Sequence, residues 1–172
     1  LALADQNLSL WQRGIVKMLT ASLFLYLPIM TLSTLNTFEL FFFVGLIGSW
    51  LGDLCLVWSG TGKRFKMGIF SFLLAHVAYG TAFLFAEIAI GLAALLLVSF
   101  CTIGVLVYMR LSSNIEGALK LPVQIYILAL CAMTAFAWSV EAPYSATAFG
   151  LCATAFLISD ISVALQRFGT HS

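Results

Sequence analysis

Six long apolar stretches, joined by short connections, are the feature that most limits the folds open to this chain. Each has about twenty residues, the length that an α-helix needs to cross the hydrocarbon core of a bilayer. They cover residues 15–35, 40–58, 67–85, 88–109, 122–140 and 145–165. Because a segment in lipid must satisfy its own backbone hydrogen bonds, we expect an all-α fold, a polytopic transmembrane helical bundle with six spans.

The composition agrees with a membrane protein and leaves little sequence for anything else. Of the 172 residues, 62% are hydrophobic and 9% are charged, and the mean hydropathy is +1.08. A typical soluble domain has about 25% charged residues. We therefore expect residues 1–172 to form a single transmembrane helical domain, and the net charge of +1 gives no indication of a nucleic-acid partner.

The basic residues all fall on one side of these spans. They precede or begin the first span, join the second to the third, flank the connection after the fourth and follow the sixth: Arg13, Lys17, Lys63, Arg64, Lys66, Arg110, Lys120 and Arg167. The opposite connections carry Glu39, Glu87 and Glu141. By the positive-inside rule the basic side faces the cytoplasm, so both ends of the chain are expected inside, at the cytoplasmic membrane if the cell is bacterial.

Two aspartates lie inside apolar spans, where an ionisable side chain is unfavourable. On a rise of about 1.5 Å per residue, Asp53 and Asp160 lie about 8 and 10 Å from the cytoplasmic ends of their spans, and His76 about 12 Å into its own. Such residues favour a functional site, since each carries an insertion cost of about 2 to 3 kcal/mol. The alternative for either aspartate alone is a carboxylate near the membrane surface, satisfied by Arg64, Arg167 or a helix end.

The two carboxyl groups together indicate acid/base chemistry. In a shared apolar site two carboxyl groups cannot easily both ionise, so one is expected to keep its proton while the other stays charged. The sequence has no Gly-x-Ser-x-Gly elbow and no glycine-rich phosphate loop, which disfavours serine acyl transfer and phosphoryl transfer. No second histidine stands at a metal-ligand spacing from His76, so we expect neither a metal nor another cofactor.

The remaining patterns concern packing between helices. Gly48 and Gly52 form a small-xxx-small pair, which lets another backbone approach Asp53 or serves helix packing alone. Five residues of the third span share one face by helical spacing: Gly68, Phe72, His76, Tyr79 and Phe83. Four cysteines lie in apolar spans without a Cys-x-x-Cys pair and are expected to be small core residues, not disulfide or zinc ligands: Cys55, Cys101, Cys131 and Cys152.

Several short motifs follow one another in an order that resembles a known family. They are Trp11-Gln12-Arg13, Lys17-Met18-Leu19-Thr20, Leu51-Gly52-Asp53-Leu54, Gly68-Ile69-Phe70-Ser71-Phe72, Ala75-His76-Val77-Ala78-Tyr79 and Ala155-Phe156-Leu157-Ile158-Ser159-Asp160. This ordered set, from Trp11 to Phe168, resembles the YhhN-like lysoplasmalogenase family of membrane hydrolases. Met18 departs from it, because members commonly have proline there. The resemblance implies an eight-helix bundle, so a first and a last helix are expected to be absent from residues 1–172.

The resemblance also implies an activity and a set of site residues. The family cleaves the vinyl-ether bond of lysoplasmalogens, releasing a fatty aldehyde and glycerophosphoethanolamine or glycerophosphocholine. Its proposed catalytic aspartates correspond to Asp53 and Asp160. The sequence itself, through polar residues at a similar depth and the polar members of the third span's shared face, adds the expected supporting or substrate-binding residues Lys17, His76, Tyr79, Gln124 and Tyr126. Lys17, Arg64 and Lys66 are candidates to meet the lipid phosphate, although for the last two a role as topology determinants is favoured. The expected partners are a lysophospholipid and the bilayer.

Two other classes of function remain open on the sequence. In a proton-coupled transporter, Asp53, His76 and Asp160 would form a relay, and in a lipid-binding membrane module they would act without turnover. An inverted repeat or broken helices at the bilayer midplane are typical of transporters, whereas the charges here lie near one surface. Release of aldehyde from a lysoplasmalogen would distinguish the enzyme from both.

Overall fold

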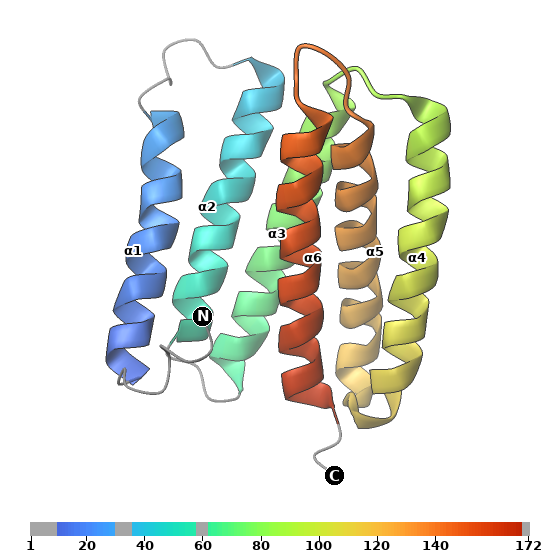
Figure 1. The fold of residues 1–172 in the computed structure, drawn as a ribbon. Helices are drawn as coiled ribbons and strands as arrows, with labels where there is room; N and C mark the ends of the chain where they lie inside the picture. Colours follow the sequence, from blue (N-terminus) through green and yellow to red (C-terminus); the bar gives the residue numbers. More distant parts are fainter. Residues whose placement is uncertain (1–9, 30–35, 58–61, 170–172) are drawn as a thin grey trace. The chain divides into compact units, whose positions relative to one another are not determined.

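The structure is a computed structural model that describes residues 10–29, 36–57 and 62–169 (Figure 1). In this part of the chain the long elements are α-helices: α1 (Leu10–Ile29), α2 (Thr37–Val57), α3 (Lys63–Leu84), α4 (Ile90–Leu111), α5 (Gly117–Ser139) and α6 (Ala146–Phe168). A short 3-10 turn, η3 (Ser112–Asn114), follows α4. The predicted all-α fold class is confirmed.

The helices correspond one by one to the predicted spans. Within the described residues, five of them, α2 to α6, are long and apolar enough to cross a membrane, and α1 contains a shorter apolar stretch, Gly14–Leu23. The chain is a multi-pass membrane protein. The first and fifth spans, predicted at 15–35 and 122–140, differ most at their starts, because α1 begins at Leu10 and α5 at Gly117. Backbone hydrogen bonding carries a helix beyond its apolar stretch into polar sequence, and residues 30–35 lie outside the described part.

The chain divides into two compact units, Leu1–Ala78 and Tyr79–Ser172. The first unit contains α1, α2 and most of α3, and the second contains the end of α3 together with α4, α5 and α6. Each aspartate of interest therefore belongs to a different unit, Asp53 to the first and Asp160 to the second. The expectation of a single domain over residues 1–172 stays a prediction.

In the first unit, glycines let α2 and α3 pack closely. A Cβ atom added at Gly48 would lie 3.1 Å from the Cβ of Ala75. One added at Gly52 would lie 2.6 Å from the ring of Phe72. The two contacts step in opposite directions along the helices, so α2 and α3 are antiparallel. The small-xxx-small pair thus admits a neighbouring helix next to Asp53, as the sequence predicts.

The predicted shared face of α3 is confirmed by burial. Its five members are all buried: Gly68, Phe72, His76, Tyr79 and Phe83. In an α-helix, side chains three and four positions apart lie on one side, so the spacing alone was sufficient to find this face.

In the second unit, the core is built mainly on α5. Seven of its residues are buried: Leu130, Cys131, Met133, Thr134, Ala135, Ala137 and Ser139. Trp138 covers Gly150 of α6, where an added Cβ would lie 2.2 Å from the indole. The indole Nε1 donates a hydrogen bond of 2.9 Å to Oγ1 of Thr154. Because a tryptophan N–H in an apolar region needs an acceptor, this pair fixes how α5 and α6 face each other.

The four cysteines carry free thiols, but they are not all in the core. Cys131 is buried, while Cys55 and Cys101 are partly buried. The prediction of a core position is wrong for Cys152, which is exposed on α6. A thiol is apolar enough to face lipid, since lipid tails are no less apolar than a protein core.

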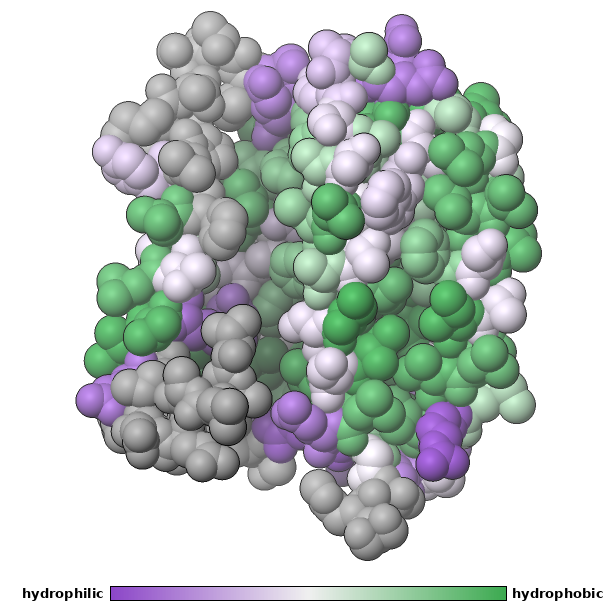
Figure 2. Space-filling model, in the orientation of Figure 1, coloured by the Kyte–Doolittle hydropathy of each residue, from purple (hydrophilic) through white to green (hydrophobic). Residues whose placement is uncertain are grey.

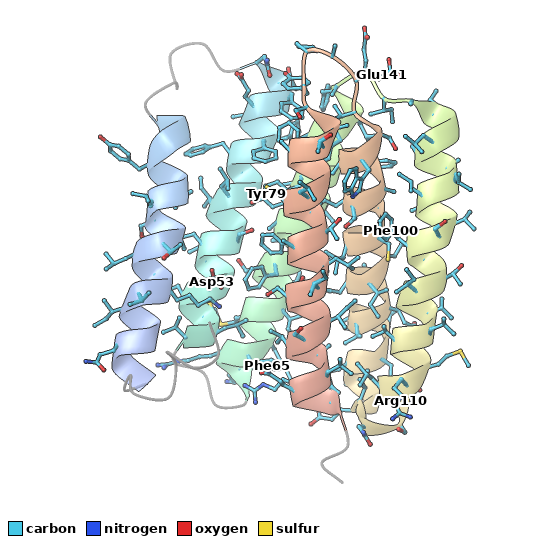
Figure 3. The ribbon with its side chains drawn as sticks, in the orientation of Figure 1. Asp53, Phe65, Tyr79, Phe100, Arg110 and Glu141 are labelled. Atoms are coloured by element: carbon cyan, nitrogen blue, oxygen red, sulfur yellow. The ribbon has the colours of Figure 1, made fainter. Side chains whose placement is uncertain are left out.

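Two charged residues, Arg110 and Glu141, mark the opposite ends of the second unit. Figure 3 shows Arg110 at the end of α4 and Glu141 beyond the far end of α5. At the Glu141 end, the backbone N–H of Glu141 donates a 2.7 Å hydrogen bond to the carbonyl of Glu87. At the Arg110 end, Nδ2 of Asn114 donates a 2.8 Å bond to the carbonyl of Phe168. The connections at both ends are therefore held together, and which end faces the cytoplasm stays a prediction.

Large apolar side chains cover the helix faces that the protein does not bury. On α4, five of them are 62–76% exposed: Ile90, Leu95, Val98, Leu106 and Met109. Figure 2 shows hydrophobic side chains over the middle of the helices and hydrophilic ones toward the ends. In water an apolar surface of this extent marks an interaction site, and its place along membrane-length helices identifies lipid as the contact.

Candidate functional site

Asp53 is bound by Lys17 of the neighbouring helix. It lies on α2, four residues before the last residue, Val57, which is about 6 Å along the helix axis. Its Oδ1 is 2.6 Å from Nζ of Lys17 on α1. The Asp53 side chain is 19% exposed and that of Lys17 is 50% exposed. Such a short contact between two ionised groups is a charge-assisted hydrogen bond. Figure 3 labels Asp53 on α2.

The packing of α1 against α2 brings these two side chains together. One turn from Lys17, Gly14 is buried, and a Cβ added there would lie 2.6 Å from Val57. On the other side, Nε1 of Trp50 donates a 3.0 Å hydrogen bond to Oγ of Ser22. Both contacts flank the ion pair and step in opposite directions along the helices. The close approach at Gly14 is therefore what lets the lysine reach across to α2.

His76 lies next to this region on the buried face of α3. Its side chain is 1% exposed, and its Nδ1 is hydrogen-bonded to the carbonyl of Phe72, one turn earlier. Because a carbonyl only accepts, Nδ1 carries the proton in this contact. The Phe72 ring in turn packs against Gly52, the neighbour of Asp53. The imidazole of His76 is thus bound within α3, and Phe72 connects α3 to the helix of Asp53.

Asp160 is bound by a tyrosine of the neighbouring helix in the second unit. The Tyr126 hydroxyl on α5 donates a hydrogen bond of 2.7 Å to Oδ2 of Asp160 on α6. Both side chains are partly buried. Asp160 lies eight residues before Phe168, the last residue of α6, which is about 12 Å along the axis. The sequence predicted both residues for the site, and the structure joins them.

Two other predicted site residues lie elsewhere in the second unit. Gln124 is exposed on α5, two residues before Tyr126. Two positions correspond to about 200° around a helix, so these side chains point in different directions. Tyr79 is 6% exposed on α3 (Figure 3). Gln124 therefore does not share the face of α5 that carries the contact between Tyr126 and Asp160.

Sequence reasoning missed some residues that hold the first unit in place. Ser22 and Trp50 bond across α1 and α2, and Ser71 donates a 2.8 Å bond to the carbonyl of Gly48 across α2 and α3. One signal was available: a tryptophan within an apolar span needs an acceptor for its N–H. The serine that accepts it was not identifiable, because serines and threonines in membrane helices also bond their own backbone, as Thr20 and Ser99 do here.

Comparison with known proteins relates the chain to a described protein family and to two curated relatives. A family model described as the YhhN family matches residues 12–172. The chain is 29% identical over 138 residues to lysoplasmalogenase TMEM86A of Bos taurus and 30% identical over 137 residues to lysoplasmalogenase TMEM86A of Homo sapiens. Each match covers 73% of this chain and 53% of the relative. The chain thus spans about half the length of these curated relatives, and no solved structure matches it.

Proposed function

The chain belongs to the YhhN family, and from this premise we propose that it is a membrane-embedded hydrolase that cleaves the vinyl-ether bond of lysoplasmalogens. Its bovine and human relatives are named lysoplasmalogenases. The substrate would be a lysoplasmenylethanolamine or lysoplasmenylcholine. The products would be a fatty aldehyde and glycerophosphoethanolamine or glycerophosphocholine.

The observation that supports this proposal is that each aspartate lies on an apolar helix and is bound by a different kind of partner. Asp53 is bound by a cation, whereas Asp160 accepts a hydrogen bond from a neutral phenol. Different surroundings for two carboxyl groups are what an acid and a base require, because the surroundings decide which of them holds a proton. We assign the charged role to Asp53 and the proton-donating role to Asp160.

The reaction needs little more than these two groups. Asp160 gives its proton to the vinyl carbon next to the ether-bearing carbon, and the C=C electron pair forms the new C–H bond. The oxocarbenium ion that results is stabilised by the Asp53 carboxylate, which takes a proton from the water that adds to it. When the hemiacetal collapses, Asp53 protonates the glycerol oxygen and Asp160 takes the hydroxyl proton. Both carboxyl groups return to their first state, and one water is consumed.

The membrane setting suits a substrate with a single hydrocarbon chain. The chain would lie along apolar helix faces, and the headgroup would stay at the surface. The vinyl-ether bond directly follows the glycerol, so it is near the headgroup layer, where Asp53 and Asp160 lie about 6 and 12 Å from the ends of their helices. We place this end at the cytoplasmic face because it carries the basic residues.

The test is aldehyde release from a lysoplasmalogen by the purified protein in detergent. Asp53→Asn and Asp160→Asn should each lower turnover by about 100-fold or more, since amides cannot transfer the proton. The double variant should be scarcely slower than either single one, as residues of one reaction are not additive. Ser162→Ala is a matched control, because this exposed serine on α6 donates its hydrogen bond to the carbonyl of Ile158 in its own helix.

Four results would reject the enzyme or its mechanism. A well-folded single variant with near wild-type turnover would contradict the acid/base assignment. Hydrolysis of the saturated alkyl-ether lysolipid at a similar rate would also contradict it, because that bond has no C=C to protonate. Binding of lysoplasmalogen without aldehyde release would favour the lipid-binding module, and proton flux into proteoliposomes without release would favour the transporter.

A further inference from the structure

Lys17 has two possible partners in the proposed reaction, the phosphate of the substrate and the carboxylate of Asp53. We propose that Lys17 is a positioning residue that acts through Asp53 and does not recognise the phosphate. This inference rests on the proposed function. Its consequence is that a substrate without a phosphate would need Lys17 as much as a lysophospholipid does.

The geometry of the pair supports this assignment. The ammonium Nζ is 2.6 Å from Oδ1, at the short end of charge-assisted hydrogen bonds. The carboxylate is the more enclosed partner, at 19% exposure against 50% for the lysine. A carboxylate that is largely removed from water depends on its counter-charge far more than an exposed lysine does. Removal of the ammonium should therefore destabilise mainly the charged form of Asp53.

The surroundings hold Lys17 in this contact. Gly14 packs against Val57 on one side of it, and Ser22 accepts the Trp50 N–H on the other. Both contacts join the same two helices, so the lysine backbone is fixed relative to α2. To reach a phosphate beyond the helix ends, Lys17 would have to leave Asp53 without its cation. In an apolar segment that separation is unfavourable.

A substrate pair distinguishes the two roles. Lysoplasmenylethanolamine and 1-O-alkenylglycerol share the vinyl-ether bond, but only the first has a phosphate. Lys17→Met should lower kcat by about 10- to 100-fold on both, because a displaced reacting group loses rate at this scale. The ratio of kcat/KM for the two substrates should stay unchanged. Lys17→Arg, which keeps the charge, should recover most of the rate. Thr20→Ala, an exposed neighbour on α1, is the control.

A double-variant comparison adds a second kinetic criterion. In the Asp53→Asn background, Lys17→Met should cause no further loss, since the lysine acts through that carboxylate. An independent, multiplicative loss would overturn the proposal. So would a loss of kcat/KM confined to the phosphate-bearing substrate, because it would assign Lys17 to the phosphate.

An infrared measurement tests the pair without any turnover. The band that disappears in Asp53→Asn identifies the Asp53 carboxyl group. In the wild type this band should be that of a carboxylate, and in Lys17→Met it should move to the position of a protonated carboxyl. An unmoved band would overturn the proposal whatever the activity. A moved band in a protein that releases no aldehyde would instead reject the proposed function and leave the pairing established.

Discussion

The hydroxyl of Tyr126 on α5 donates a 2.7 Å hydrogen bond to Oδ2 of Asp160 on α6. In an apolar region, a donor of this kind fixes which carboxyl oxygen accepts and which way the group faces. We assign the transferred proton of the proposed reaction to this carboxyl group. Asp53 is held in a different way, by an ammonium group on α1. The two carboxyl groups therefore differ in electrostatic surroundings.

Replacement of Tyr126 by phenylalanine removes the hydroxyl and keeps the ring. We expect kcat to fall by about tenfold with little change in KM, because the Asp160 carboxyl loses its orientation while the apolar surface stays. The loss in stability should be about 1 kcal/mol, the usual contribution of one hydrogen bond. Steady-state kinetics and thermal unfolding in detergent measure these effects. Unchanged kcat in a folded Tyr126→Phe protein would show that the hydroxyl has no part in the reaction.

A methyl group added at Gly52 should force the neighbouring structure to shift. In Gly52→Ala the new Cβ would lie 2.6 Å from the Phe72 ring, so α3 or that ring must shift. We expect a destabilisation of about 1 to 3 kcal/mol and a lower rate, since Asp53 is the next residue. Gly80→Ala on α3 is the control, because an added Cβ there meets nothing within 4 Å. Equal unfolding temperatures for the two variants would contradict close packing at Gly52.

His76 should matter for structure and rate, but not as a metal ligand. Its imidazole is buried and its Nδ1 is engaged by the Phe72 carbonyl. His76→Ala should lower both the unfolding temperature and turnover, with a stability loss of about 2 to 4 kcal/mol from the cavity and the lost bond. A chelator should leave wild-type turnover unchanged. Loss of activity on chelation that zinc restores would reverse this assignment.

The orientation in the membrane can be read from cysteine labelling in intact cells. Ser113→Cys reports the end of the second unit with Arg110, and Glu141→Cys reports the other end, where only the backbone of Glu141 bonds Glu87. An impermeant maleimide should label the second variant and reach the first only after permeabilisation, as the positive-inside rule requires. Wild-type protein gives the background of the native thiols. The reverse pattern would place the basic end outside.

Gly62, in the connection before α3, is less suitable for a cysteine in this experiment, because its φ of 95° is strained for any side chain.

The sequence alone determined the fold class, the approximate spans and the residues worth testing. In lipid a helix must satisfy its own backbone hydrogen bonds, so hydropathy and length identify each span without knowledge of its neighbours. The buried face of α3, with His76 and Tyr79, followed from spacing. Asp53 and Asp160 stood out because ionisable residues are rare in such segments. The starts of α1 and α5 were less predictable, since polar residues continue each helix beyond its apolar stretch.

Only the tertiary structure decided which side chains meet. A helix that is apolar on all sides has no sequence signal for its rotation about its own axis, because lipid and protein interior accept the same residues. Rotation is set by close contacts, such as Gly14 against Val57 and Gly150 beneath Trp138. These contacts turn Lys17 toward Asp53 and Tyr126 toward Asp160, and they leave Gln124 exposed on another face of α5. The chemistry of each carboxyl group thus depends on packing between helices, which no single span encodes.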